Sequence, residues 1–230
     1  MTSYKAQKYI CMLPVLCALL AVRAAEAGDF KRFELQPFAG YSVSGNVPLV
    51  DDDGVEHGTV HVDDSYHLGA SFTVYLNELD AVEGFWQRQF TEGRLPDEIV
   101  TPVSAGGVTR FNLKIDQIHC NFLHHYEIRE DPRARPYVMA GLGVTEFHAN
   151  RLGRNFSKAH FSFSVGGGMK YFLTSHIGLR GEARWSPSLL AASDGSYWCE
   201  IGGEGAKCAI HLKTTWQDQL DFTAGLLFRF

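Results

Sequence analysis

The feature that most constrains this chain is a two-residue alternation of apolar and polar side chains. It is clearest between Phe161 and Trp185, where Phe161, Phe163, Val165, Met169 and Tyr171 alternate with Ser162, Ser164, Gly166, Gly168 and Lys170. Successive side chains of a β-strand point to opposite faces, so a period of two indicates a strand with one apolar and one polar face. After a short turn at Leu173 to His176 the alternation resumes from Ile177 to Trp185, which predicts a hairpin.

The same pattern predicts strands along the rest of the chain. The segments that alternate cleanly are 33–43, 68–76, 138–144 and 220–230. Val82 to Phe90 and Phe111 to Tyr126 are strand-like but less regular, and in the second the apolar set shifts between Leu113 and Ile118, which we interpret as a bulge. The sequence thus predicts eight strands joined by alternately long and short connections, with four long loops on one side. This arrangement is typical of outer-membrane barrels.

Residues 1–27 have the features of a cleaved signal peptide. Lys5 and Lys8 precede an apolar run from Ile10 to Val22, and Ala25-Glu26-Ala27 has the small-x-small form of a cleavage site. A retained anchor helix is the alternative, but such a helix needs about 20 apolar residues, and this run is shorter. We therefore expect export, cleavage after Ala27 and a mature domain spanning 28–230.

The charge balance and the hydropathy of the mature domain exclude two classes of protein. Cleavage removes three of 21 basic and one of 26 acidic residues, which leaves 18 and 25 and a formal net charge of −7. An acidic domain has little electrostatic support for nucleic-acid binding. No later apolar run is long enough for a transmembrane helix, whereas a transmembrane strand needs only about 9 to 11 residues. No linker divides the domain, so we expect a single unit.

Alternation alone does not distinguish a membrane barrel from a soluble barrel such as a lipocalin, in which the apolar face points inward. Glycine and long charged residues share the polar phase here, for example Gly166 and Gly168 beside Lys170. The interior of an eight-stranded barrel is just wide enough for its own side chains, so small residues opposite long ones suit a filled polar lumen. We predict an all-β, eight-stranded antiparallel up-and-down transmembrane β-barrel.

Charged residues of the polar phase are nearly balanced, as a filled lumen requires. The predicted lumen charge network consists of Glu34, Lys170, Arg180, Glu182, Arg184 and Asp221, within a larger polar-phase set that adds Glu83, Lys114 and Asp116. Charges withdrawn from water are tolerated when they are paired and hydrogen-bonded. The alternative is that these are solvated charges on a soluble sheet. The lumen interpretation predicts a plugged barrel.

Four segments together resemble one known family. They are FELQPFAGY at 33–41, FSFSVGGGMKYF at 161–172, IGLRGEAR at 177–184 and GLLFRF at 225–230. The sequence resembles the outer-membrane β-barrel domain family of OmpA-like and opacity-type proteins over nearly all of the mature domain. The resemblance implies a Gram-negative outer membrane location. It also implies that Phe222, Leu226, Phe228 and Phe230 are the signal read by the barrel-assembly machinery.

Other candidate sites give weaker signals. Cys199 and Cys208 lie in the last long loop of a protein expected in an oxidising compartment, so we predict a disulfide between them. Cys120 is interpreted as a small apolar residue facing lipid. The acidic first loop, Asp51 to Asp64 with His57 and His61, lacks the EF-hand pattern and is interpreted as solvated, so no metal site is expected.

The favoured function is a structural or surface-interaction barrel, and two alternatives remain open. A narrow ion-conducting channel is one. The other is a lipid-modifying enzyme, suggested by His160-Phe161-Ser162, because lipid A deacylases of this barrel size carry a similar pair. Phe163 replaces the asparagine of those enzymes and Ser162 lies in the lumen phase, so no catalytic residue and no cofactor are expected. Expected partners are outer-membrane lipid, lipopolysaccharide and an unidentified surface ligand, with the protein as a monomer.

Overall fold

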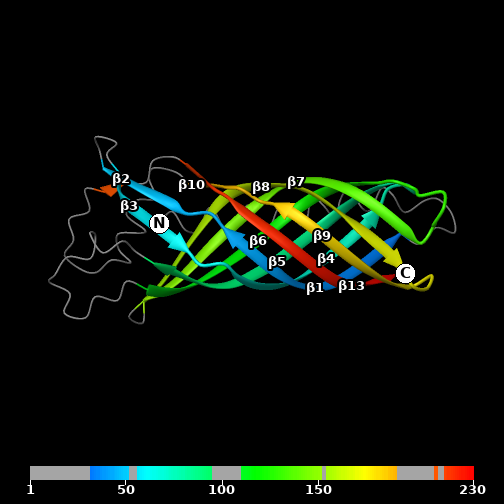
Figure 1. The fold of residues 1–230 in the computed structure, drawn as a ribbon, viewed down its shortest axis with the longest axis horizontal. Coiled ribbons are helices and arrows are strands. Elements are labelled where there is room, and N and C mark those ends of the chain that lie inside the picture. Colours follow the sequence, from blue (N-terminus) through cyan, green and yellow to red (C-terminus); the bar gives the residue numbers. More distant parts are fainter. Residues whose placement is uncertain (1–31, 52–55, 95–109, 152–153, 191–209, 212–214) are drawn as a thin grey trace.

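The computed structural model describes residues 32–51, 56–94, 110–151, 154–190, 210–211 and 215–230. Eight long strands within these ranges form the body of the molecule (Figure 1). They are β1 (Phe33–Ser44), β4 (Ser65–Tyr75), β5 (Asp80–Arg94), β6 (Arg110–His125), β7 (Ala134–Arg151), β8 (Arg154–Phe172), β9 (Ile177–Trp185) and β13 (Gln219–Arg229). None of the described residues forms a helix with the length and apolar character needed to cross a bilayer.

The eight long strands close into a barrel. Each pairs antiparallel with the next one along the chain, and β1 pairs with β13 from Glu34 opposite Arg229 to Ser44 opposite Gln219. Within the described residues every long strand therefore pairs with a neighbour on both sides, and the strands form a closed barrel. The predicted fold, an eight-stranded antiparallel up-and-down barrel, is confirmed.

The two ends of the barrel differ. At one end, the turn end, short connections join β4 to β5, β6 to β7 and β8 to β9. In the first of these the Asn77 side chain accepts hydrogen bonds from the backbone N–H groups of Leu79 and Asp80, and in the last Thr174 does the same for His176 and Ile177. Such side-chain bonds stabilise tight turns. Phe230 also lies at this end, where its backbone exchanges two hydrogen bonds with Phe33.

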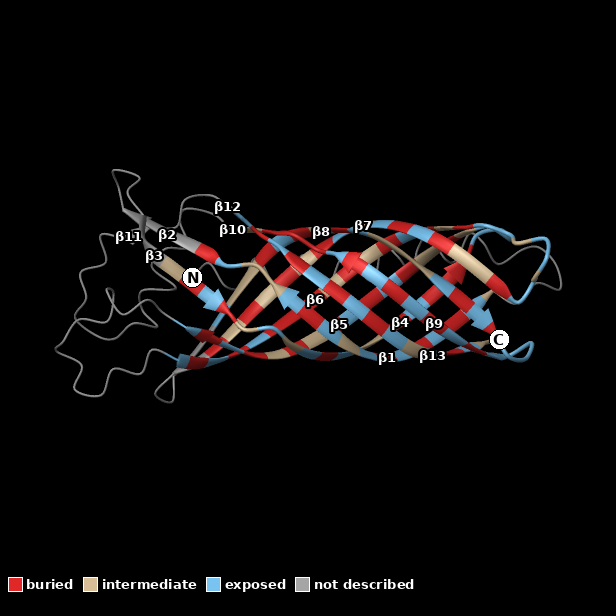
Figure 2. Ribbon diagram, viewed as in Figure 1, coloured by how far each residue is buried: buried red, intermediate tan, exposed pale blue. Residues whose placement is uncertain are grey.

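Five shorter strands lie at the other end, the loop end. They are β2 (Val47–Asp51), β3 (Glu56–Val62), β10 (Ser188–Leu190), β11 (Ile210–His211) and β12 (Thr215–Gln217). Figure 1 labels β2, β3 and β10 there, and Figure 2 labels β11 and β12. β2 and β3 form a hairpin, β11 pairs with β2, and β3 joins the barrel through His61 and Val62 opposite Arg94 and Gly93 of β5. The described part of the first connection therefore contains two paired strands, and β3 attaches them to β5 at the loop end.

Burial alternates along each barrel strand (Figure 2). The exposed phase is apolar over the middle of the barrel, for example Phe222 at 50% and Leu142 at 58% exposed, while the buried phase carries charged and amide side chains. Aromatic rings border this apolar band at both ends, with Phe33 against Phe72 and Phe230 at the turn end and Phe163 against Trp185 and Trp216 at the loop end. Apolar side chains thus face outward, which excludes the lipocalin-like arrangement.

Glycines of the polar phase lie where the lumen is most crowded. A Cβ at Gly168 would stand 2.6 Å from the Tyr137 hydroxyl, and one at Gly225 would stand 2.7 Å from the Gln36 amide nitrogen. By contrast, a Cβ at Gly181, on the outer phase, meets no atom within 4 Å. The inward glycines therefore make room for the long lumen side chains.

The structure corrects the interpretation of a bulge in 111–126. The register of β6 with β5 and with β7 is continuous from Asn112 to His124, so the strand keeps one phase. What changes is the lumen, which is apolar at Leu113 and Ile115 and polar farther along the strand. Consequently Lys114 is exposed on the outer wall, and Asp116 pairs there with Arg88 rather than in the lumen.

The prediction of four long loops is wrong for the third connection. β7 and β8 remain paired as far as Arg151 opposite Arg154, so this connection is an extended two-stranded ladder. Its outer side chains include Glu146 and His148, and its inner ones are Phe147 and Ala149. In this ladder the apolar residues face inward, whereas in the middle of the barrel they face outward. The sequence pattern of the ladder therefore differs from that of a lipid-facing strand.

Candidate functional site

The lumen residues near the turn end form an ionic group, the lower cluster. It consists of Glu34 on β1, Tyr75 at the end of β4, Lys170 on β8 and Arg229 on β13. The Glu34 carboxylate accepts hydrogen bonds from Lys170 Nζ at 2.6 Å, from the Tyr75 hydroxyl at 2.9 Å and from Arg229 Nε at 3.0 Å. Because Glu34 and Arg229 belong to the first and last strands, this cluster links the two strands that close the barrel.

A second group, the central cluster, fills the middle of the lumen. It comprises Glu83 on β5, Tyr137 on β7, and Arg180, Glu182 and Arg184 on β9. Arg180 pairs with both Glu83 and Glu182, and its Nε donates to the Tyr137 hydroxyl at 2.6 Å. Arg184 donates to Glu182 at 2.7 Å, and its guanidinium lies 3.4 Å from the Phe85 ring centroid. Every charge of the cluster therefore has an oppositely charged partner at contact distance.

Asp221 belongs to a separate upper cluster. Its carboxylate accepts hydrogen bonds from Ser42, from Gln87 at 3.1 Å and from Gln219 at 2.8 Å. His67 lies 3.8 Å away and contacts Ser42 at 2.7 Å. In this cluster uncharged donors, rather than a lysine or an arginine, surround the buried carboxylate.

An apolar layer, the cap, covers the polar lumen at the loop end. Its buried members are Val47, Val60, Val62, Phe111, Leu113, Ile115, Phe147, Ala149 and Leu190. They come from the β2–β3 hairpin, from β6 and β7, and from β10. This apolar layer disfavours the passage of ions at the loop end, because charged groups and water are costly to place in apolar surroundings.

All six residues predicted to form the lumen network lie inside the barrel, where they are nearly fully buried. Five of them fall in the lower and central clusters, and Asp221 does not join them. Tyr75, Tyr137 and Arg229 also belong to these clusters, although the sequence pattern did not predict it. Arg229 lies on the polar phase of β13, and the two tyrosines mark positions where a hydroxyl satisfies a buried carboxylate.

The residues of the predicted assembly signal share the outer face of β13. Phe222, Leu226, Phe228 and Phe230 are all exposed there, and the Phe230 ring lies 6.2 Å from the Phe33 ring. The remaining residue of interest on this strand, Leu227, faces inward and is buried. The strand therefore presents one uninterrupted apolar face.

The other candidates from the sequence have different outcomes. Cys199 and Cys208 lie outside the described residues, as does the cleavage site at Ala27. Ser162 is fully buried in the lumen and is hydrogen-bonded to His119 at 2.8 Å, and the His160 ring contacts Phe147 edge-on. Within the described ranges, no group of three or more His, Cys, Asp or Glu side chains is arranged to hold a metal ion.

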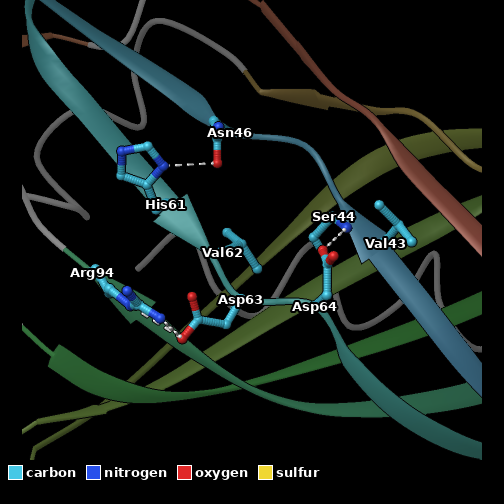
Figure 3. Close-up of a pocket in the computed structure, with 8 residues that line it drawn as sticks. All are labelled: Val43, Ser44, Asn46, His61, Val62, Asp63, Asp64 and Arg94. Atoms are coloured by element: carbon cyan, nitrogen blue, oxygen red, sulfur yellow. Dashed lines mark hydrogen bonds and ion pairs between the residues drawn. The ribbon is translucent and has the colours of Figure 1, made fainter.

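A pocket of about 600 Å³ lies outside the barrel at the loop end (Figure 3). It is formed where β1 passes into β2, where β3 passes into β4, and by the end of β5. Its walls are Val43, Ser44, Asn46, His61, Val62, Asp63, Asp64 and Arg94. Asp63, Asp64 and His61 of the acidic first loop thus form one side of a pocket.

Comparisons with known proteins agree with this architecture. The family model described as outer membrane protein beta-barrel domain matches residues 15–195. Neisserial surface protein A is similar with a TM-score of 0.55 and 12% identity over 86% of this chain and 97% of that chain. Outer membrane protein OprG from Pseudomonas aeruginosa is similar with a TM-score of 0.54 and 13% identity over 87% and 97%. No curated protein matches the sequence. At these identities the structural likeness shows the fold alone.

Proposed function

Because the chain belongs to the outer membrane protein beta-barrel domain family, we propose that it is a closed barrel that makes contacts at the surface of a Gram-negative cell. In this proposal residues 1–27 direct export and are removed, and the barrel-assembly machinery inserts the mature domain as a monomer among outer-membrane lipid and lipopolysaccharide. The turn end faces the periplasm and the loop end faces the medium. No role in nucleic-acid binding is proposed.

The observation that carries the proposal is the cap above a charge-balanced lumen. The lower, central and upper clusters contain four cations and four carboxylates, namely Lys170, Arg180, Arg184 and Arg229 with Glu34, Glu83, Glu182 and Asp221. These side chains fill the polar part of the lumen and hold one another by ion pairs and hydrogen bonds. A lumen filled in this way supports a structural and surface role better than a conducting one.

The extended β7–β8 ladder supports a role at the surface. Beyond the apolar band, its outer side chains join a polar group in which Asp116 binds Arg88 at 2.8 Å and His148 at 3.0 Å. Polar outer walls are suited to water rather than to lipid. The ladder and the β2–β3 hairpin would therefore project into the medium as ordered elements.

The two alternatives have less support. A channel would require the cap to move and the central cluster to separate, which leaves buried charges without partners. A lipid-modifying enzyme built on His160 and Ser162 would need a lipid to reach the lumen, whereas Ser162 is buried and already bonded to His119.

Two measurements test the proposal. Surface proteolysis of intact cells, combined with fractionation, should cleave the connections at the loop end of a membrane-bound protein that needs detergent for extraction. Planar bilayer recordings of the purified wild type should show little conductance. Recovery as a soluble periplasmic protein would refute the location, and a large, steady conductance unaffected by Arg180→Ala would favour the channel.

A further inference from the structure

The pocket in Figure 3 lies apart from the lumen clusters and has its own polar lining. Arg94 donates from Nε and Nη2 to a single oxygen of Asp63, Oδ2, at 3.1 and 2.7 Å. Asp64 accepts the backbone N–H of Ser44 through Oδ1 at 2.9 Å, and the His61 ring nitrogen Nδ1 lies 3.1 Å from the Asn46 side-chain oxygen. These bonds hold the side chains in place between three separate strand junctions.

The same side chains keep polar atoms free to bind a ligand. Within the described part of the chain, Asp63 Oδ1, Asp64 Oδ2 and Arg94 Nη1 make no hydrogen bond. The side chain of Arg94 is 45% exposed and that of Asp63 is 31% exposed, so a molecule in the pocket can reach both. The pocket therefore offers two carboxylate acceptors and one guanidinium donor together.

The charges of the pocket select the class of ligand. Asp63 neutralises Arg94, while Asp64 has no cationic partner among the described residues. The described lining of the pocket therefore carries a net negative charge, which disfavours anions such as phosphates or acidic sugars. A metal ion is also disfavoured, because no suitable group of His, Cys, Asp or Glu side chains exists among the described residues. A neutral molecule rich in hydroxyl groups matches the free atoms, since each hydroxyl both donates and accepts.

We propose that this pocket binds a neutral saccharide. Neighbouring hydroxyls of one sugar ring would donate to Asp63 and Asp64 and accept from Arg94, and the C–H side of the ring would rest on Val43. A volume of about 600 Å³ is sufficient for one or two sugar units. The inference rests on the proposed surface role, because the pocket meets carbohydrate in the cell only if the loop end faces outward. The carbohydrate could come from the bacterium's own lipopolysaccharide core or from a host glycan.

Isothermal titration calorimetry on the purified full-length protein in detergent micelles tests the site. The probes are glucose, galactose, mannose and lactose, with galacturonate and sialic acid as acidic comparisons. Saturable binding of at least one neutral sugar is expected, with weaker binding of the acidic ones. Asp64→Asn and Arg94→Gln should each weaken it by about tenfold, because each removes a charge-assisted hydrogen bond. Asp131→Asn, at the turn end, is the matched control and should bind as the wild type does.

Heat-modifiable migration on gels verifies that each variant is folded. Dephosphorylated lipopolysaccharide core oligosaccharide and neutral animal-cell oligosaccharides then distinguish the two sources. Absence of binding by every neutral sugar, stronger binding of the acidic sugars, or unchanged affinity in both pocket variants would overturn the proposal. The titration uses purified protein, so its result does not depend on where the loop end lies in the cell. If the protein binds sugar but its loops are not exposed on intact cells, the surface role alone is refuted. Exposed loops without sugar binding would refute the site alone.

Discussion

In this lumen a buried charge needs a partner and a long side chain needs space. Arg180 illustrates the first requirement and Gly168 the second. Arg180 is 3% exposed and satisfies its charge through Glu83 and Glu182, which lie on two different strands. Gly168 supplies no side chain and so leaves space for Tyr137, whose hydroxyl binds both Arg180 and Glu182. Charge pairing and available volume are therefore coupled within the central cluster.

Replacing Arg180 with alanine should strongly destabilise the barrel. The substitution leaves Glu83 and Glu182 buried together with only Arg184 to offset them, and the expected loss in unfolding free energy is roughly 3 to 5 kcal/mol if the site stays dry. Urea unfolding in detergent micelles measures it. Arg110→Ala is the control, because Arg110 is 59% exposed and lies 3.9 Å from Glu92, so its loss should cost about 1 kcal/mol or less. Equal effects of the two substitutions would contradict a paired lumen network.

Substituting alanine for Gly168 tests the packing of the lumen. The added methyl group would clash with the backbone carbonyl oxygen of Gly181 and would lie 2.6 Å from the Tyr137 hydroxyl. The paired backbones of β8 and β9 must therefore shift, and Tyr137 must move and weaken its bonds to Arg180 and Glu182. Overpacking of this kind typically costs about 1 to 3 kcal/mol. Gly181→Ala, on the open outer face of the neighbouring strand, should leave the unfolding free energy almost unchanged. If both substitutions change the unfolding free energy equally, the lumen does not require a glycine at position 168.

At the scale of strands, much of the fold could be predicted from the sequence because phase is a local property. The alternation in 161–185 identifies β8 and β9 and the faces of their side chains, and closure follows from eight such strands. Contacts between strands depend on register, which no local pattern supplies, so the pair of Glu83 with Arg180 across 97 positions was not predicted. The pocket combines Asp63, between β3 and β4, with Arg94 at the end of β5, and the sequence pattern indicates only the acidic side.

The last strand provides a test of the assembly signal, which stays a prediction. Deleting Phe230, or replacing it with aspartate, should leave export intact but block insertion, so that a periplasmic species accumulates. Fractionation and heat-modifiable gel migration measure the outcome. Phe33→Ala is the control, because it removes the ring contact between Phe33 and Phe230 without changing β13. If Phe33→Ala blocks insertion equally, the ring contact between Phe33 and Phe230 is required rather than a signal at Phe230. Normal insertion of the Phe230 variants would exclude the assembly signal.

At the scale of the whole molecule, the outer surface has an apolar zone and a polar zone. The lumen has the opposite polarity at each of these two heights. In the middle of the barrel the exterior is apolar and the lumen is charged, whereas toward the loop end the exterior carries Arg88, Asp116 and Glu146 and the lumen holds the cap. This inversion follows from the change of solvent outside, because the strands themselves keep one continuous register. The position where the exterior becomes polar therefore indicates the outer boundary of the bilayer.

The same arginine placed at two heights on the outer wall tests that boundary. Ala140 on β7 is exposed beside Phe122 and Val165 in the apolar band, whereas Ala159 on β8 pairs with Glu146 in the polar zone. An arginine near the bilayer midplane costs about 2 to 4 kcal/mol and one near the interface about 0 to 1 kcal/mol. Ala140→Arg should thus lower the unfolding free energy in lipid vesicles by the larger amount, and Ala159→Arg should change it little, because its charge meets water and Glu146. In short-chain detergent, which accommodates a charge more readily, the difference should shrink. If the two variants lose equal stability in vesicles, the polar zone lies within the bilayer and the barrel sits deeper in the membrane than its outer surface indicates.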